Sequence, residues 1–492
     1  MSHDNLGFTS STDALDAKAW HANSKPVQNN HAQKNNRSTV YALELEEKKK
    51  GIQEYDDDDY DPYEHRTVAH PTTNVETLFH LLKGSLGTGI LAMPMAFHNS
   101  GYALGMVATI IIGLLCTYCM RILVTSQYAL SKRKKVPSMT YPATIEAALE
   151  EGPACLRRFS KSSIHVTNTF LLIYQLGSCC VYVVFIANNL KRAFNSFLPD
   201  DIKLQLTEKV YMALLLLPLI FINWIKNLKF LVPCSKVATA ITFVSFGIIL
   251  YYIFKDPLSF ENREPVGEIQ NFPLYFGTVL FALEAIGVIM PLENEMKTPR
   301  SFTANCGILN FGMGTIVILY AGIGFFGYIR YGSIIEGSIT LNLPSEEALA
   351  KSVQLLLALA IYFTQPIQCY VAIDIAWNEY LSPRFEKNPH KKLWEYVVRT
   401  GLVLITTLLA IAVPSLEYFI SLFGALCLSA LGLGFPAIIQ LCTCWKEASR
   451  GQKAWLLVKN LTVVTIGIIG LVVGTYTSLK EIFEKVILKQ TN

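Results

Sequence analysis

Long apolar runs, each of about 20 residues, fill the chain between residues 75 and 477 and constrain its fold more than any other feature. A helix of about 20 apolar residues is long enough to span the hydrocarbon core of a bilayer. Only 16% of the residues are charged and 51% are hydrophobic, whereas a typical soluble protein has about 25% charged residues. The sequence therefore predicts an all-α polytopic membrane protein and excludes an ordinary soluble enzyme.

About eleven segments meet this length criterion, and we take each as a candidate transmembrane helix. Their approximate limits are 75–98, 102–126, 164–190, 208–224, 233–254, 272–292, 304–329, 351–377, 395–413, 416–440 and 454–477. The fourth segment is short, and only Val413, Pro414 and Ser415 separate the ninth from the tenth. Merging those two would give a span far too long for one bilayer, so about eleven transmembrane helices are expected.

The first 72 residues differ in composition from the rest. They are rich in Asn, Ser, Asp, Lys and His, include the acidic run 56–59, and have too little apolar mass for a core. No basic segment followed by a short apolar run marks a cleavable signal peptide, so the first span would insert the chain itself. We expect a disordered cytosolic tail over 1–72, a transmembrane core over 73–477 and a short C-terminal tail over 478–492.

Basic residues near the span ends predict the orientation. Lys and Arg are retained on the cytosolic side, and with a cytosolic N-terminus most of them fall there, including those of 131–135, 384–392 and 446–453. An odd number of spans would then place the C-terminal tail on the opposite side. The net charge of +4 is too small and too scattered for a nucleic-acid surface, so the expected surroundings are a lipid bilayer, with no nucleic acid.

The first span is crowded with residues that break helices. Gly84, Gly87, Gly89 and Pro94 lie near its middle, and each glycine costs a helix roughly 1 kcal/mol. Irregular backbone at bilayer depth is tolerated only where it lines a cavity or is buried in protein. An unwound segment would expose amide groups and a helix N-terminus suited to a carboxylate. Alternatively, these glycines only permit close packing between helices.

The sixth span has a matching interruption. Glu284 and Gly287 lie in its middle, and Gly277 and Pro291 mark its ends. Interrupted helices at corresponding positions of two halves are typical of transporters built from inverted repeats, with the substrate site near the bilayer midplane. Since spans 1 and 6 are five apart, the pattern indicates a repeat of five plus five helices, although no repeat is visible residue by residue.

Ionisable residues inside spans are functional candidates because each is costly to bury. His80 in the first span has an ordinary pKa of about 6.5 and could exchange a proton near neutral pH. Glu284 could carry a proton or accept a hydrogen bond from a substrate amine. The alternatives are a neutral histidine and a protonated glutamic acid that each join two helices. Asp374, at the end of the eighth span, is interpreted as a gate or interface charge.

Three segments together resemble a known family. They are TLFHLLKGSLGTGILAMPMAF, YFGTVLFALEAIGVIMPLENEMKTPRSF and YGSIIEGSITLNLP. The sequence is similar, over about residues 73–477, to the proton-coupled amino acid transporter branch of the amino acid/auxin permease family, within the amino acid, polyamine and organocation superfamily. The resemblance implies a LeuT-like fold with broken helices 1 and 6, alternating access, and proton symport of small neutral amino acids such as alanine, glycine and proline.

The same resemblance implies roles for individual residues. Proton coupling falls on His80, and the PLEN stretch with Glu293 shapes the inner gate. Glu284 is a second proton-coupling candidate, and Asp374 a gate candidate, from their own chemistry and position. The implied substrate-binding residues are Gly84, Ser85, Leu86, Gly87, Thr88, Gly89, Phe281 and Glu284. The proton is the implied coupling ion, with no cofactor and no metal. The partners are a small neutral amino acid, the proton and the lipid bilayer.

Other functions remain open from the sequence. The same fold could couple to sodium or act as a facilitative carrier, and Thr364 in the eighth span offers a hydroxyl of the kind sodium sites use. A third alternative is an amino acid receptor with little flux, whose N-terminal tail engages signalling partners. An enzyme is not expected, because the motifs HExxH, GxSxG and GxxxxGK[ST] are missing. Plasma membrane and lysosomal or endosomal membrane fit equally.

Overall fold

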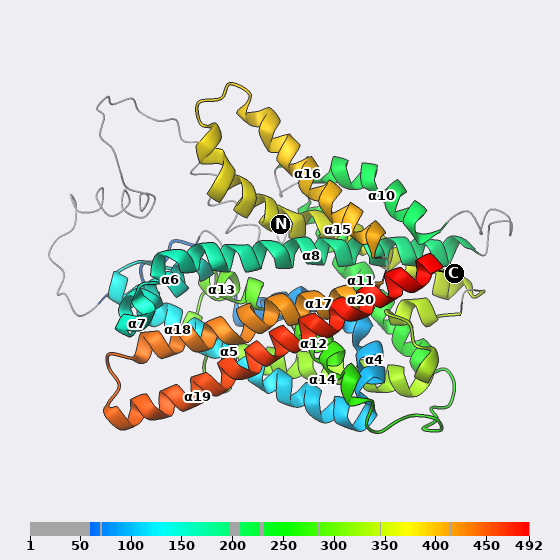
Figure 1. The fold of residues 1–492 in the computed structure, drawn as a ribbon, viewed down its shortest axis with the longest axis horizontal. Helices are drawn as coiled ribbons and strands as arrows, with labels where there is room; N and C mark the ends of the chain where they lie inside the picture. The colour runs from blue at the N-terminus through cyan, green and yellow to red at the C-terminus, as the bar shows by residue number, and fades with distance from the viewer. Residues whose placement is uncertain are drawn as a thin grey trace, which may run out of the picture.

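The computed structural model describes residues 60–68, 71–195, 207–226, 231–283, 285–344, 346–413 and 415–491. These residues are helical apart from their connections (Figure 1), and the β-structure among them is an isolated parallel bridge between Thr72 and Met296. The expectation of an all-helical protein is confirmed.

The helices follow one another along the whole described chain. The first half contains α3 (Asn74–Ser85), α4 (Thr88–Ser100), α5 (Tyr102–Lys134), α6 (Tyr141–Glu151), α7 (Ala154–Arg157), α8 (Ser160–Phe194), α10 (Glu208–Asn223) and α11 (Val232–Phe254). The second half contains α12 (Phe272–Ala282), α13 (Ile286–Asn294), α14 (Ile308–Tyr331), α15 (Ala348–Ile373), α16 (Lys391–Ala412), α17 (Leu416–Phe423), α18 (Phe435–Cys444), α19 (Arg450–Ile469) and α20 (Thr475–Thr491).

Shorter helical segments complete the fold. The π-helical segments η7 (Asp374–Leu381), η9 (Gly424–Gly434) and η10 (Gly470–Gly474) extend α15, join α17 to α18, and join α19 to α20. The 3₁₀ segments are η3 (Ile269–Asn271), η4 (Pro299–Ser301), η5 (Gly332–Ile334), η6 (Ile339–Asn342) and η8 (Ser382–Phe385).

Nine helices among the described residues are long and apolar enough to cross a membrane. Two predicted spans are not among them. The first is divided between α3 and α4, with 12 and 13 residues, and the fourth corresponds to α10, which has 16 residues. Both of these segments are predominantly apolar, so the number of about eleven spans stays a prediction. At the other end of the core, α20 continues to Thr491, past the predicted boundary at residue 477.

Helices from the two halves pair in the order that a five plus five repeat requires. Contacts join α4 to α12, α5 to α14, α8 to α15, and α10 to α16. Figure 1 shows the last pair side by side at the top of the view. Each helix thus contacts the one five spans later, and because five is odd, the two partners cross in opposite directions. This arrangement agrees with the inverted repeat that the sequence predicts.

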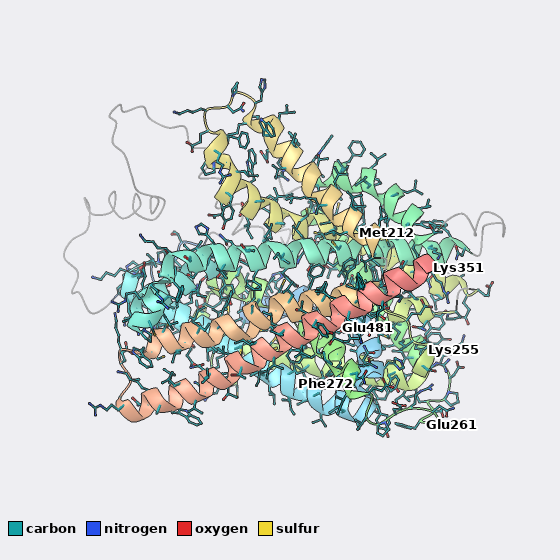
Figure 2. All side chains as sticks on the ribbon, in the orientation of Figure 1. Met212, Lys255, Glu261, Phe272, Lys351 and Glu481 are labelled. Atoms are coloured by element: carbon teal, nitrogen blue, oxygen red, sulfur yellow. The ribbon has the colours of Figure 1, made fainter. Side chains whose placement is uncertain are left out.

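Ion pairs divide the molecule into two faces. On the first face, Arg133 pairs with Glu151 and Glu447, Lys134 with Glu150, Lys226 with Glu395, and Arg300 with Asp61. On the second face, Lys191 pairs with Glu208, Lys255 with Glu347, Arg330 with Asp256, and Lys485 with Glu417. Each pair joins residues that the sequence assigns to the same side. Figure 2 shows Lys255, Glu261 and Lys351 at the end of the molecule where α20 ends.

The two ends of the described chain lie on opposite faces. Asp61 is on the first face with Arg300. The continuous helix from Leu416 to Cys444 ends on that face too, because Arg133 donates a hydrogen bond to the Thr443 carbonyl at 3.0 Å. Glu417 at its start, and Lys485 bound to it at 3.1 Å, are therefore on the second face. The chain crosses between the faces an odd number of times.

Candidate functional site

The first broken helix is interrupted between α3 and α4. The Leu86 amide still donates to the Leu82 carbonyl at 3.0 Å, whereas the Gly87 amide turns back to the Ser85 carbonyl at 2.9 Å. Gly87 is the N-cap of α4 and brings no side chain that could cap it. The first amides of a helix lack partners within the helix. An N-terminus with amide donors therefore begins inside the protein, as the glycines of this span predict.

The second broken helix is interrupted between α12 and α13. The Leu283 amide closes the last turn of α12 on the Val279 carbonyl at 2.9 Å, and Ala285 is the N-cap of α13. Glu284, the residue predicted for both proton coupling and substrate binding, lies outside the described residues. Both predicted interruptions are therefore present, and the structure does not test the role of Glu284.

The two breaks lie against each other. Contacts join α3 to α13 and α4 to α12, so each half of the first broken helix packs on one half of the second. A Cβ atom added at Gly89 would lie 2.6 Å from the Cα atom of Ala282, in the last turn of α12. One added at Gly84 would lie 3.5 Å from the Val288 side chain on α13. Glycine at position 89 therefore lets the two backbones meet beside the interruption.

Space remains beside this contact. A Cβ atom built at Gly87 meets no heavy atom of the described residues within 4 Å, although the residue is half-buried. The neighbouring Thr88 and Gly89 are buried. Among the described residues there is therefore room for at least a methyl group beside the first amides of α4.

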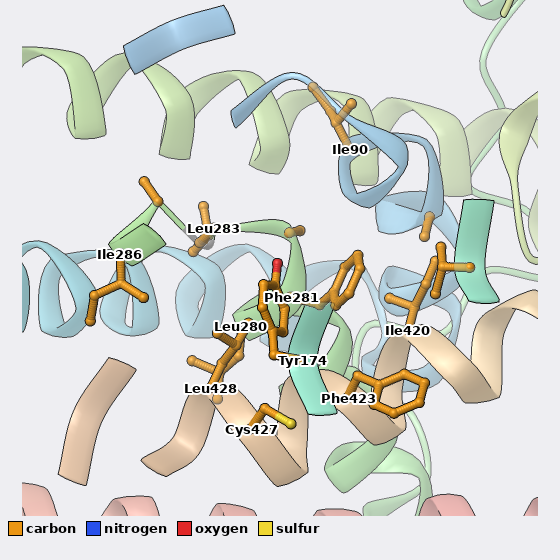
Figure 3. Close-up of a cluster of buried hydrophobic side chains, with 14 of the residues drawn as sticks. Ile90, Tyr174, Leu280, Phe281, Leu283, Ile286, Ile420, Phe423, Cys427 and Leu428 are labelled. Atoms are coloured by element: carbon orange, nitrogen blue, oxygen red, sulfur yellow. The ribbon is translucent and has the colours of Figure 1, made fainter. Parts of the chain in front are cut away.

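Tyr174 and Phe281 form one wall near the breaks. Their ring centroids are 6.0 Å apart, and both side chains are buried. Figure 3 shows the Tyr174 ring pointing away from Cys427 and toward the end of α12, with Ile90 of α4 across from Phe281. Phe281 is a predicted site residue, whereas Tyr174 was missed. The only sequence signal for it is the polar pair of Tyr174 and Gln175 inside the apolar run of α8.

Tyr320 on α14 is a second residue that the sequence did not single out. Its hydroxyl donates a hydrogen bond to the Ser85 carbonyl, in the last turn of α3. Both residues are buried. A carbonyl at a helix end has no partner within the helix, so this hydroxyl stabilises the interrupted backbone.

Replacing Tyr320 by phenylalanine should weaken this support. The buried Ser85 carbonyl would keep the hydrogen bond from the Gly87 amide but lose the one from the hydroxyl, at a cost of about 0.5–1.5 kcal/mol. We therefore expect lower thermal stability and a several-fold fall in amino acid uptake per molecule at the surface. Tyr362→Phe is the matched control, because its hydroxyl also donates to a carbonyl, that of Pro218, but at an exposed position. Equal uptake by the two variants would argue against the support role.

His80 lies on α3, between the first face and the break. It is half-buried, and Glu76 and Lys83 are one helical turn away on the same side of the helix. The helix itself packs on α13 and α14. His80 is thus near a carboxylate and an ammonium group, one turn of helix short of Gly84.

The two predicted gate residues lie on different helices. Glu293 on α13 is almost fully buried, with 1% of its side chain exposed, and accepts a hydrogen bond from Arg66 at 3.0 Å. Asp374 begins η7 and accepts a hydrogen bond from Asn378 of the same segment at 2.6 Å. Arg66 comes from the segment assigned to the tail, and its role is not visible in the sequence pattern.

Comparison with known proteins gives the family. Residues 70–480 match the family described as "Transmembrane amino acid transporter protein". The "Proton-coupled amino acid transporter-like protein pathetic" of Drosophila melanogaster is 41% identical over 424 residues, which cover 86% of this chain and 88% of that protein. The "Probable amino acid transporter skat-1" of Caenorhabditis elegans is 27% identical over 425 residues, 85% of this chain and 91% of that protein.

The similarity to a solved structure is weaker than these sequence similarities. The structure of Mhp1, a nucleobase-cation-symport-1 family transporter, in a closed conformation with bromovinylhydantoin bound, aligns with a TM-score of 0.42 and 14% identity. The alignment covers 89% of this chain and 96% of that one. The family match and the Drosophila relative each span most of the chain. This chain therefore belongs to the amino acid/auxin permease family, in its proton-coupled amino acid transporter branch, and is a multi-pass membrane protein of the amino acid transporter class.

Proposed function

We propose that the protein is a secondary active transporter that couples the entry of protons to that of small neutral amino acids by alternating access. The observation that supports this most directly is the pair of interrupted helices that lie against each other, with room for an added methyl group at Gly87 among the described residues. Interrupted helices of this kind bind substrate at the bilayer midplane in other transporters. The name of the Drosophila relative describes a proton-coupled amino acid transporter-like protein.

In this proposal the substrate lies between the two breaks. The amides of Thr88 and Gly89, at the start of α4, would hold its carboxylate. Backbone carbonyls around Leu86 and Phe281 would accept from its ammonium group, with Gly84 and Ser85 completing the unwound segment. The described walls nearby are apolar or aromatic, including Ile90, Tyr174 and Phe281. Such walls favour a small side chain without charge.

His80 would carry the coupling proton in this proposal, with Glu284 as the second candidate. A protonated imidazole is attracted by Glu76 and repelled by Lys83, which are both one turn away. The charge state of His80 therefore changes the forces acting on α3, the half-helix that leads to the break. Proton binding and movement of that half-helix would be linked in this way.

The proposed orientation places the first face, with residues 60–68, in the cytosol. The basic residues on this face support it, because Lys and Arg are retained on the cytosolic side. The membrane would be the plasma membrane or that of a lysosome or endosome. Residues 1–59 would belong to a cytosolic tail, and a receptor role through that tail is the alternative to transport.

Uptake measurements test the proposal. Cells expressing the protein should accumulate labelled alanine, glycine or proline several-fold faster at an outside pH of about 5.5 than at about 7.5, because these values lie on either side of the ordinary histidine pKa. Replacing sodium by choline should leave the uptake unchanged. Dependence on sodium would instead indicate a sodium-coupled carrier, and binding of amino acids without flux would indicate a receptor.

A further inference from the structure

Arg66 anchors the segment before α3 to the first face of the molecule. Its guanidinium pairs with the Glu293 carboxylate at 3.0 Å, and the exposed fractions of the two side chains are only 7% and 1%. The same guanidinium donates to the Glu293 carbonyl at 3.2 Å and to the Pro137 carbonyl at 3.1 Å. One side chain therefore joins the end of α13 to the segment that follows α5.

A second ion pair and a ring stack surround Arg66. Asp61 pairs with Arg300 at 2.5 Å and accepts a hydrogen bond from the Tyr128 hydroxyl at 3.3 Å. The rings of Tyr63 and Tyr128 stack with centroids 4.5 Å apart, and the Arg66 guanidinium lies 4.7 Å from the centre of the Tyr63 ring. Residues 60–68 are therefore held at several points by α5 and by the segment after α13.

The segment is also fixed where it enters α3. The Thr72 amide donates to the Glu295 carbonyl, and the Lys297 amide donates to the Thr72 carbonyl, both at 2.9 Å. Thr73 then caps α3, together with Glu76. Since α3 and α13 are the halves of the two broken helices that point to the first face, these bonds tie both halves to each other at that face.

We propose that residues 60–68, 71 and 72 form a releasable latch that closes the substrate site on the first face, and that this latch must detach before the site opens there. The inference rests on transport by alternating access as proposed above. Parting α3 from α13 at this face would separate Thr72 from Glu295, and Arg66 cannot follow both α13 and the segment after α5. A buried charge is not left unpaired, so Arg66 and Glu293 separate only when water reaches them. The latch therefore has two states, docked and hydrated.

The Asp61 and Arg300 pair of the latch does not titrate in the pH range of transport. Burial alone would raise the pKa of the Asp61 carboxyl. Hydrogen bonds from the Tyr63 amide and from Arg300 outweigh this effect and hold the pKa below the ordinary value of 3.8. A lowered pKa means that the ion pair contributes stability above about that pH and loses it only in stronger acid. Between about pH 5.5 and 7.5 the Asp61 and Arg300 pair stays charged on both sides.

A thiol at position 87 can report whether the site is open. Gly87→Cys places a sulfur where the structure has room, and a membrane-impermeant thiol reagent is applied to each side of sealed vesicles in turn. We expect Arg66→Ala and Glu293→Ala to raise the rate of modification from the first face at least tenfold. The same variants without Gly87→Cys give the background reaction of exposed thiols such as Cys155 and Cys306, which is subtracted from the measured rate. Arg158→Ala, an exposed arginine on this face, is the matched control and should leave the rate unchanged.

Charge exchange separates release of the latch from general damage. Arg66→Glu combined with Glu293→Arg should return the rate toward that of the parent. Asp61→Arg combined with Arg300→Asp should likewise lower the modification rate below that of Asp61→Arg alone. Because 75% of the Arg300 side chain is exposed, a charge exchange is tolerated more easily at this pair. Both double variants are compared with their single variants by size-exclusion profile and modification rate.

Two outcomes would overturn the latch. One is an Arg66→Ala protein that is monodisperse and reacts at the parental rate. The other is a failure of both charge exchanges to restore protection in monodisperse protein. The assay needs no substrate, so faster modification without uptake of alanine, glycine or proline would support the latch while contradicting the proposed function.

Discussion

We expect a Gly89→Ala variant to lose transport almost completely. The added methyl group would lie 2.6 Å from the Cα atom and 3.1 Å from the Cβ atom of Ala282. The first of these is a backbone atom and cannot turn away, so α4 and α12 would have to move apart at the breaks. Overpacking of this kind costs about 1–3 kcal/mol or more, and we expect uptake to fall at least tenfold, through lower surface expression, lower activity or both.

Gly87→Ala is the matched control for this prediction, because its methyl group meets no atom of the part of the chain that the structure describes within 4 Å. This variant should reach the surface normally, and its KM for the amino acid should rise because the methyl group occupies space assigned to the substrate. Surface biotinylation with uptake at several substrate concentrations separates the two cases. Normal transport by Gly89→Ala, or loss of surface expression by Gly87→Ala alone, would contradict the described contact between the breaks.

His80→Gln should remove the stimulation of uptake by external acid. Glutamine keeps a hydrogen-bonding side chain of similar size but cannot take up a proton in this range. If His80 carries the coupling proton, the ratio of uptake at about pH 5.5 to that at about pH 7.5 should fall from several-fold to about one. A dye that reports internal pH should show no acidification during uptake.

His98→Gln provides the control, since His98 is the other half-buried histidine of the first broken helix, packed near the Tyr328 ring at 5.7 Å between centroids. It lies on α4, at the opposite end of that helix from His80. This variant should keep both the pH ratio and the acidification. A His80→Gln protein that remains acid-stimulated would move the coupling site elsewhere, with Glu284 the next residue to replace.

The interruptions of the two helices could be predicted from the sequence because glycine acts locally. Gly87 and Gly89 weaken the helix whatever surrounds them, and the break lies between Ser85 and Thr88. Pro94 is expected from the sequence to break the helix together with these glycines, but it does not interrupt it. It lies inside α4, which continues to Ser100, because neighbouring helices stabilise a proline-containing membrane helix that would be weak alone.

The supporting residues could not be predicted, because their roles depend on contacts between distant parts of the chain. Tyr320 meets Ser85 across 235 positions, and Arg66 meets Glu293 across 227. Neither pair has a spacing or composition that marks it. Residues 60–68 have the polar composition of a tail, so only the packing reveals that Asp61 and Arg66 bind the helices.

The placement of Asp61 and Lys485 on opposite faces also determines how the chain meets its surroundings. Whichever way the protein is inserted, the segments around Asp61 and Lys485 face different aqueous compartments. A kinase, protease or ubiquitin ligase confined to one compartment can act on the segment that carries Arg66 or on the end of α20, but not on both. Modifying enzymes on the side of Arg66 would find their target next to the closing contacts, while those on the other side would find the outer end of the last helix and exposed connections such as 255–268.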